Sequence, residues 1–365
     1  MNAQQDDGFL KEITGLSTFT LALIGGSREG HLFANGNMQI GIIINIQAVA
    51  ADNEEVVTLS PEQLDSIELV NKITDKKLSG EWEYSSEEND YRHQLPGSSI
   101  IRDTNLSYGR DAISDDSEPQ KKIYWLKTKK SETIEIIARV TLDGKTHVSD
   151  DSHHKGSHLV VTGHEPIIYH PNNLVPKPIN EEKVAHGTYE VKQTVTTYDV
   201  FGKHSNILFD YPEWTQNNYY LFPDNGFKVH DVEIRNTVND EDPLKYNYRR
   251  FTHHTRSNNL YLWFLWGTYS AKRTAGAAYR VVIEDSPDLT SSNKREATPQ
   301  EEIVTTTRTD VVSLSRLYFE SPAAGFWVDK ADNIPQFKFR DIYGNESVFL
   351  KIIMDNADSF YLQEG

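Results

Sequence analysis

Six of the thirteen histidines fall between residues 147 and 170, and this cluster has the residue types and spacing that could do chemistry. Imidazole and carboxylate groups at such separations could hold Zn²⁺ or Ni²⁺, because a hairpin brings the ends of two strands together. The candidate ligands are His147, His153 and His158. The cluster lacks a His-Glu-x-x-His signature, and its Asp-Asp-Ser-His-His-Lys-Gly-Ser run is typical of an exposed loop tip. We therefore prefer a polar loop with pH-sensitive charge, keep the metal site as the alternative, and expect no cofactor.

A second cluster, residues 209–224, mixes aromatic and polar side chains. A sugar ring stacks its apolar side on flat aromatic faces, while Asp and Asn groups bond its hydroxyls. The predicted glycan-binding residues are Tyr211, Trp214, Asn217, Tyr219, Tyr220 and Asp224. The alternative is a long connection whose aromatic side chains fill the edge of a β-sandwich.

A third cluster, residues 245–256, contains no acidic residue in a chain that is otherwise acidic. The predicted partner-binding residues are Lys245, Arg249, Arg250 and Arg256. They could contact an acidic partner, or the acidic segments 103–120 and 239–242 of a second copy, which favours self-association. A strand with one solvated face explains the same residues.

Two stretches, residues 194–197 and 304–309, are rich in Thr and alternate in character. They resemble the amphipathic hairpins with which β-pore-forming toxins line a membrane barrel. The exposed faces of ordinary antiparallel sheets have the same pattern.

Signatures of catalysis are missing from the chain. It has no Gly-x-Ser-x-Gly elbow, phosphate-binding Gly-rich loop, dinucleotide fingerprint or EF-hand loop. The absence of cysteine excludes disulfides, thiolate catalysis, iron–sulfur clusters and zinc bound by sulfur. We therefore expect a protein that is not an enzyme.

The formal net charge of −17 disfavours nucleic acid and anionic membranes as partners. No apolar run is long enough for a transmembrane helix, and we expect no conventional signal peptide at the N-terminus. We expect a bacterial protein that stays in the cytoplasm or is exported by a route without such a signal.

The elements that must position these clusters are strands. Apolar residues recur at every second position between Met38 and Ala50, which predicts a long strand with one buried face. Residues 260–266 are apolar on both faces and predict a central strand covered on both sides. One short helical turn is expected at 60–63 because of its capping residues, and 286–300 is expected to be a surface loop.

One pattern, Asp-β-branched-aromatic-Gly-x-x-Ser, occurs at 199–205 and again at 341–347. Each copy lies between two predicted strands and predicts a hairpin turn in which glycine takes a positive φ. The second copy resembles the last hairpin of bacterial immunoglobulin-like and fibronectin type III-like modules. This resemblance implies a β-sandwich fold and a role in adhesion, binding or scaffolding.

The sequence thus predicts an all-β protein with two antiparallel β-sandwich domains (immunoglobulin-like or jelly-roll) in tandem. Residues 1–19 form a lead, 20–170 the first domain with an acidic loop at 103–120, 171–182 a proline-rich linker, and 183–365 the second domain. The leading hypothesis is a binding or structural protein that acts by surface recognition or self-association as a homo-oligomer. The alternatives are a toxin-like protein that binds a cell-surface glycan and inserts a hairpin into membranes, and a jelly-roll enzyme that acts on glycans.

Overall fold

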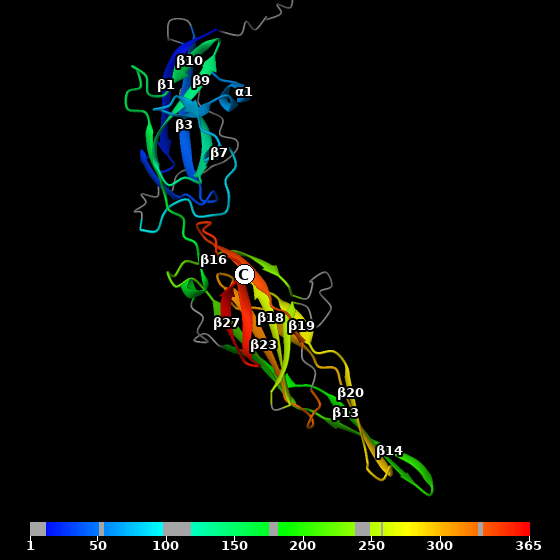
Figure 1. Ribbon diagram of the computed structural model, residues 1–365. Coiled ribbons are helices and arrows are strands. Elements are labelled where there is room, and N and C mark those ends of the chain that lie inside the picture. Colours follow the sequence, from blue (N-terminus) through cyan, green and yellow to red (C-terminus); the bar gives the residue numbers. More distant parts are fainter. Residues whose placement is uncertain are drawn as a thin grey trace, which may run out of the picture. The chain divides into compact units, whose positions relative to one another are not determined.

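The computed structural model describes residues 12–50, 55–97, 118–174, 182–237, 249–256, 258–327 and 331–365. The chain divides into two compact units (Figure 1). The first is Met1–Ile167 with Tyr343–Asn345, and the second is Ile168–Ile342 with Glu346–Gly365. Strands make up most of both, so the protein is all-β, as predicted. Most of the predicted linker 171–182 and of the acidic loop 103–120 lies outside the described residues, and the predicted domain bounds stay a prediction.

The described residues of the first unit form two sheets. One has the order β1 (Ile13–Leu23), β3 (Ile40–Ala50), β8 (Gln120–Thr128) and β7 (Trp82–Ser85), with β4 (Glu55–Val57) paired to β3. The other has the order β2 (Glu29–Phe33), β11 (Leu159–His164), β9 (Thr133–Leu142), β5 (Glu68–Asn71) and β6 (Lys76–Lys77), with β10 (Lys145–Val148) paired to β9. One pair departs from the antiparallel expectation, because β2 and β11 run parallel.

The predicted stripe of residues 38–50 forms β3. Ile42, Ile44 and Ile46 are fully buried there, which confirms the period-two pattern. The predicted helical turn is α1 (Pro61–Asp65), where the Ser60 side chain accepts from the Gln63 backbone and the Gln63 side chain accepts from the Ser60 backbone. This capping box satisfies backbone donors that a five-residue helix would otherwise leave unpaired.

In the second unit, the part of the chain that the structure describes forms four sheets. The largest has the order β12 (Glu182–Thr188), β15 (Glu213–Leu221), β23 (Val312–Phe319), β18 (Asn259–Gly267), β17 (Arg250–Arg256) and β24 (Ala331–Asp332). A second has the order β16 (Val229–Arg235), β25 (Gln336–Asp341), β26 (Leu350–Asn356) and β27 (Ser359–Glu364), and β19 (Lys272–Gly276) pairs with β22 (Gln300–Val304). The fourth, here called the projecting sheet, has the order β14 (Gly202–Asp210), β13 (Val191–Asp199), β21 (Ser291–Ala297) and β20 (Arg280–Asp285). A short 3-10 turn, η1, covers Pro171–Asn173.

The central strand of the second unit is β18, as its two apolar faces predicted. Leu260, Leu262 and Phe264 pack on one side in a cluster of buried residues. On the other side the Trp263 ring lies 5.5 Å from that of Phe360, and its Nε1 donates to the Ala357 carbonyl at 2.9 Å. Because both faces are covered, this strand shows no alternation.

Two sequence expectations for the second unit are wrong. Residues 286–300 are not one surface loop, because they contain strand β21 in the middle of the projecting sheet. Residues 213–221 are not a connection, because they form β15 within the largest sheet. In β21 both faces contact solvent, so the strand carries Ser, Asn, Lys, Arg and Glu and lacks the apolar alternation by which strands are recognised.

Candidate functional site

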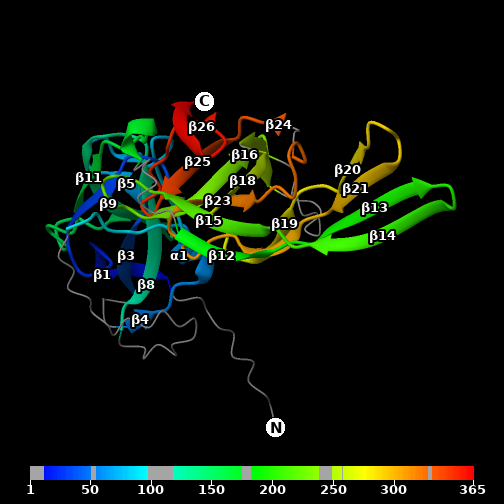
Figure 2. The ribbon, with the colours of Figure 1, turned by 90° about the horizontal axis from the view of Figure 1, so that it is seen from below.

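The projecting sheet consists of two hairpins that extend beyond the other sheets of the second unit (Figure 2). Strand β13 pairs with β14 over nine residue pairs, from Val191–Asp210 to Asp199–Gly202, and with β21 on its other side. Strand β20 pairs with β21 and forms the opposite edge. Among the described strands, none pairs with the outer edge of β14 or of β20.

Cross-strand rows assign the side chains to the two faces of this sheet. One row is Ile207, Thr194, Lys294 and Ile283, and a second row on the same face is Phe209, Lys192, Glu296 and Val281. Each row places apolar side chains at the two edges and polar ones in the middle. Lys294 and Glu296 form an ion pair of 2.8 Å in this middle zone.

The edge strand β14 is exposed along its entire length. Ile207, Leu208 and Phe209 are 55%, 54% and 52% exposed, on both faces of the sheet. Proteins usually protect an edge with charges or proline, because an open edge offers unpaired backbone groups to any other strand. Residues 205–209 carry neither, so this edge is open both in its backbone and in its side chains.

The tip of the β13–β14 hairpin exposes two more apolar residues. Val200 and Phe201 form the turn and are 93% and 89% exposed. The Phe201 amide donates to the Asp199 carboxylate at 2.8 Å, and Gly202 follows with a φ of +126°. Both features are typical of an Asp-x-x-Gly hairpin turn, which confirms the turn predicted at 199–205.

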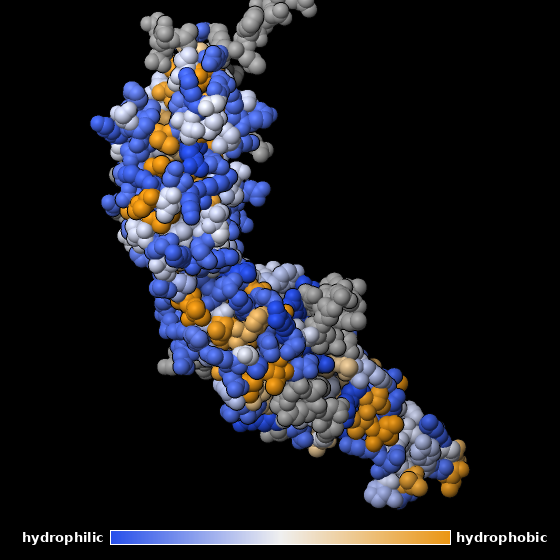
Figure 3. All heavy atoms as spheres, turned by 45° about the horizontal axis from the view of Figure 1, so that its top comes forward, coloured by the Kyte–Doolittle hydropathy of each residue, from blue (hydrophilic) through white to orange (hydrophobic). Residues whose placement is uncertain are grey.

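The turn between β20 and β21 brings a further apolar side chain to the same end of the sheet. Leu289 is 76% exposed, and the adjacent Thr290 carbonyl accepts from the Tyr198 amide at 2.8 Å. The Asp288 carboxylate accepts from Ser286 and from the Thr290 hydroxyl and amide, and these hydrogen bonds lower the pKa of Asp288 to about 2. Figure 3 shows apolar side chains gathered at this projecting end.

The second copy of the turn motif also has its glycine at positive φ, but its environment is different. Gly344 has a φ of +79°, and its neighbour Tyr343 is 7% exposed. Within the first unit the Tyr343 ring lies 5.9 Å from that of Phe33, and Asn37 donates to the Gly344 carbonyl at 2.8 Å. One copy therefore buries its aromatic residue, whereas the other presents Phe201 to solvent.

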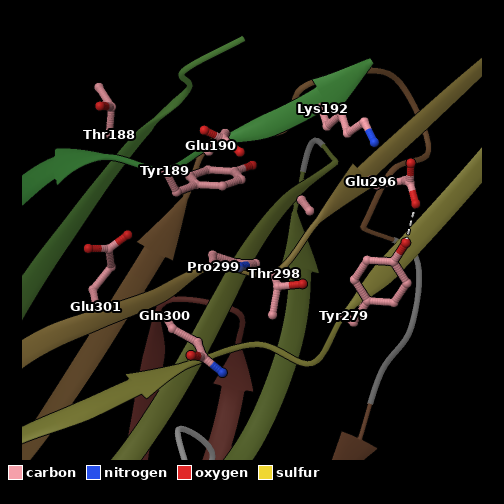
Figure 4. A pocket seen from close by; sticks show the side chains of 11 residues that line it. Thr188, Tyr189, Glu190, Lys192, Tyr279, Glu296, Thr298, Pro299, Gln300 and Glu301 are labelled. Atoms are coloured by element: carbon pink, nitrogen blue, oxygen red, sulfur yellow. Dashed lines mark hydrogen bonds between the residues drawn. The ribbon is translucent and has the colours of Figure 1, made fainter. Parts of the chain in front are cut away.

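A cavity of about 430 Å³ lies at the base of the projecting sheet (Figure 4). Its lining includes three carboxylates, Glu190, Glu296 and Glu301, beside one ammonium, Lys192. Tyr279 donates to Glu296, which raises the pKa of the phenol, and burial raises the pKa of Glu301. This lining suits a cationic or hydroxyl-rich group, and it contains no histidine, the side chain that most often moves protons near neutral pH.

The structure separates the predicted glycan residues. Trp214, Tyr219 and Tyr220 are at most 5% exposed, and the Tyr219 ring lies 4.9 Å from that of Trp263 in the core. Asn217 accepts from Arg316 at 3.2 Å. Tyr211 is 55% exposed, and Asp224 is also exposed. Three of the four predicted rings thus contribute to the core, and the glycan site stays a prediction.

The predicted partner-binding residues are described only in part. Lys245 lies outside the described residues. Arg256 pairs with Asp358 at 2.7 Å, Arg250 begins β17, and Arg249 precedes it with a φ of +57°. Arg249 also lines a second cavity of about 530 Å³ with Trp266 and Tyr269.

The predicted metal ligands lie in three different settings. His147 is in β10, where burial lowers its pKa, and His153 is exposed in the following loop. His158 lies 3.2 Å from Asp150, which also pairs with Lys72 at 2.9 Å and accepts from the Gly156 amide at 2.6 Å. In the described part of the chain no group of three or more His, Asp or Glu is placed to hold a metal ion. The metal site stays a prediction without support from this geometry.

Sequence reasoning missed the exposed apolar residues of the projecting sheet. Two signals could have found them: Val-Phe at a turn, where polar residues are usual, and three consecutive apolar residues in a short strand. Among the helices of the described ranges, none has the length and apolar character needed to cross a membrane.

No protein-family model matches the chain, and no curated protein matches it. Among solved structures, the C-terminal domain of the antigen I/II-family protein AspA of Streptococcus pyogenes is 10% identical over 92% of this chain and 98% of that chain, with a TM-score of 0.19. The C-terminal domain of the antigen I/II polypeptide BspA of Streptococcus agalactiae is 11% identical over 95% and 99%, with a TM-score of 0.18. Superpositions this poor carry no argument about function.

Proposed function

We propose that this chain is a non-enzymatic binding or assembly protein that acts by contact through its projecting sheet. The observation that carries the proposal is the exposure of apolar residues at both the edge and the tip of that sheet. Monomeric soluble proteins rarely leave contiguous large apolar side chains in water, and such patches mark interaction sites. The tip residues Val200 and Phe201, at 93% and 89% exposed, bury little of their apolar surface against the described part of the chain.

The position of these residues also supports recognition. The Asp199 and Asp288 hydrogen bonds hold the two turns in fixed conformations, so the apolar tip is presented without a large ordering cost. A preorganised aromatic side chain is the kind of residue that carries most of the energy of a protein contact.

A photo-crosslinking experiment tests this function. A benzophenone amino acid would replace Phe201 in the full chain, and in a matched variant it would replace Tyr361 of β27, which is 51% exposed. Both proteins would be irradiated alone, with phosphatidylcholine vesicles, and on a glycan array. We expect adducts from position 201 in at least one setting and few from position 361. Equal yields at the two positions in every setting, or robust turnover on polysaccharide or ester substrates, would overturn the proposal.

A toxin-like protein that binds a cell surface is the second candidate, because Thr194–Thr197 of the predicted amphipathic stretch lies in β13, directly below the apolar tip. Its test is dye release from phosphatidylcholine vesicles by the wild-type chain and by Phe201→Ser. Release that depends on Phe201 favours this candidate. The open edges of β14 and β20 argue against insertion of a single copy, because unpaired backbone groups are costly in lipid.

A further inference from the structure

We propose that two copies of this chain associate by antiparallel pairing of their β14 strands about a two-fold axis at Ile207. This inference rests on the proposed function and names the partner of the projecting sheet. The result would be one continuous sheet with the order β20, β21, β13, β14 and then the same four strands of the second copy in reverse.

The outer edge of β14 offers backbone donors and acceptors that another strand can pair with. In an edge strand, one residue directs both its backbone N–H and its C=O toward the neighbouring strand, and the next residue directs both toward solvent. On β14 the inward groups pair with β13, and no described strand covers the outward ones. Water hydrates these groups on a free edge, and an extended segment is the protein element that can pair with the whole row, which is the mode of β-strand addition.

The edge of β20 is a poorer candidate than that of β14. Strand β20 carries Arg280, Glu284 and Asp285 among its six residues. Such charges discourage edge pairing. In β14 the charged or titratable residues stand at the two ends, at Lys203, His204 and Asp210, and leave 205–209 uncharged.

The sequence of β14 is complementary to itself in the antiparallel direction, which favours a second copy as the partner and favours one register. In an antiparallel pair with a two-fold axis perpendicular to the sheet, a residue at the axis faces its own equivalent. With the axis at Ile207, the two Ile207 side chains meet, and Phe209 of each copy lies opposite Ser205 of the other. On the other face, His204 stands opposite Asp210 of the second copy, so opposite charges pair across the edge when the imidazole is protonated. Within one chain His204 lies 3.5 Å from Asp199, so it already has one acidic neighbour.

One of the two neighbouring registers, the one with its axis at Asn206, is less favourable. With the axis at Asn206, Lys203 would lie opposite Phe209 of the second copy, and His204 opposite Leu208. That arrangement would place cationic groups against apolar ones and would leave Asp210 without an opposite charge. Of these two registers, the one with its axis at Ile207 therefore pairs the charged residues better.

The same register also accounts for the apolar tip. Because the strands are antiparallel, the tip of each copy extends past the base of the other copy's sheet. The paired region ends with His204 of one copy opposite Asp210 of the other, where β14 ends, so the tip at Val200 and Phe201 lies beyond that end, toward the exposed Tyr211 of the other copy. The pairing would thus cover the β14 edge and bring the tip of each copy close to the base of the other copy's sheet.

Sedimentation equilibrium of the full chain tests the association. We expect a concentration-dependent dimer for the wild type and at least a tenfold weaker association for Ile207→Lys, because two like charges would meet at the axis. The matched control is Ile283→Lys, which lies in the same cross-strand row on the opposite edge and is 59% exposed against 55% for Ile207. It should associate like the wild type. Circular dichroism would confirm that both variants remain folded.

Disulfide trapping tests the register. Because the chain has no cysteine, only the introduced cysteines can form a crosslink. Residues that face each other across an antiparallel pair have Cα atoms about 4.5–5.5 Å apart, within the range of a disulfide. Ile207→Cys should therefore crosslink two copies on oxidation, whereas Asn206→Cys and Ile283→Cys should not.

Three results would overturn this inference: a monomer at all concentrations, equal association of the two lysine variants, or efficient crosslinking through Asn206→Cys in place of Ile207→Cys. A monomer that still crosslinks from position 201 to vesicles or glycans would reject the dimer and leave the proposed function in place. A monomer without any preferential crosslinking from that position would reject both.

Discussion

Ile207 and Ile283 lie in one cross-strand row at the two opposite edges of the projecting sheet, and both are more than half exposed. Thr194 and Lys294 stand between them. At its base the sheet contributes Val191 and Ala297 to the buried cluster, and beyond that base it is polar along its centre and apolar along its edges. The exposed apolar edges make this sheet a candidate interaction surface. Ile207 and Ile283 are also the matched positions that the dimer test compares.

The two copies of the Asp-x-x-Gly turn should respond differently to a substitution of glycine by alanine. Gly202 and Gly344 both have positive φ, so alanine should introduce strain of about 1–3 kcal/mol at either site. At Gly344 the new Cβ would also lie 2.4 Å from the Asn37 Cβ, which should cost about 1–3 kcal/mol more through overpacking. At Gly202 nothing lies within 4 Å. In urea unfolding, Gly344→Ala should lose more stability than Gly202→Ala, and the reverse order would contradict the packing described for Tyr343.

The aromatic residues predicted to bind sugar should differ in how much they contribute to the free energy of unfolding. Trp214→Ala and Tyr219→Ala remove buried rings and should each lower the free energy of unfolding by about 3–5 kcal/mol. Tyr211→Ala removes an exposed ring and should change it by less than about 0.5 kcal/mol. Urea denaturation measures all three. A stable Tyr219→Ala variant would show that its ring is not part of the core.

The stability of the protein should depend on a buried polar network that joins β15, β23 and β18. Ser315 accepts from Trp266 Nε1 at 2.9 Å and donates to Asn218 Oδ1 at 2.6 Å, and all three side chains are buried. Ser315→Ala would leave a buried donor and a buried acceptor without this partner, so we expect a loss of about 1–3 kcal/mol by urea denaturation. The control is Ser17→Ala in β1, whose hydroxyl bonds are exposed and whose loss should be near neutral.

The β20–β21 turn should keep its structure to unusually low pH. A carboxyl whose pKa is lower in the folded than in the unfolded state contributes stability that is present above the unfolded pKa and is lost as pH falls through the folded pKa. For Asp288 the hydrogen bonds from Ser286 and Thr290 lower the pKa from 3.8 to about 2. The turn should therefore stay ordered at pH 3 and loosen toward pH 2.

Nuclear magnetic resonance titration of the Asp288 carboxyl carbon, together with the Leu289 amide, measures this effect. In Ser286→Ala the midpoint should move up toward the ordinary value, because one stabilising hydrogen bond to the ionised form is gone. A wild-type midpoint near 4 would show that the turn does not form in solution as described.

The sequence by itself determined the class of fold and several local structures. The period-two stripe of β3, the two-faced apolar run of β18, the capping box of α1 and the paired Asp-x-x-Gly turns all follow from local patterns, because alternation, capping and positive φ are properties of a few adjacent residues. These are the parts of the fold that sequence reasoning predicted.

Only the tertiary structure decided which surfaces are buried and which are open. The same turn motif hides Tyr343 and exposes Phe201, and the aromatic residues of β15 pack inward although their composition suits a sugar. Strand β21 could not be recognised from its polar residues, since its place is set by pairing with β13 and β20. Burial depends on which distant segments come together, and that information is not contained in the spacing of neighbouring residues.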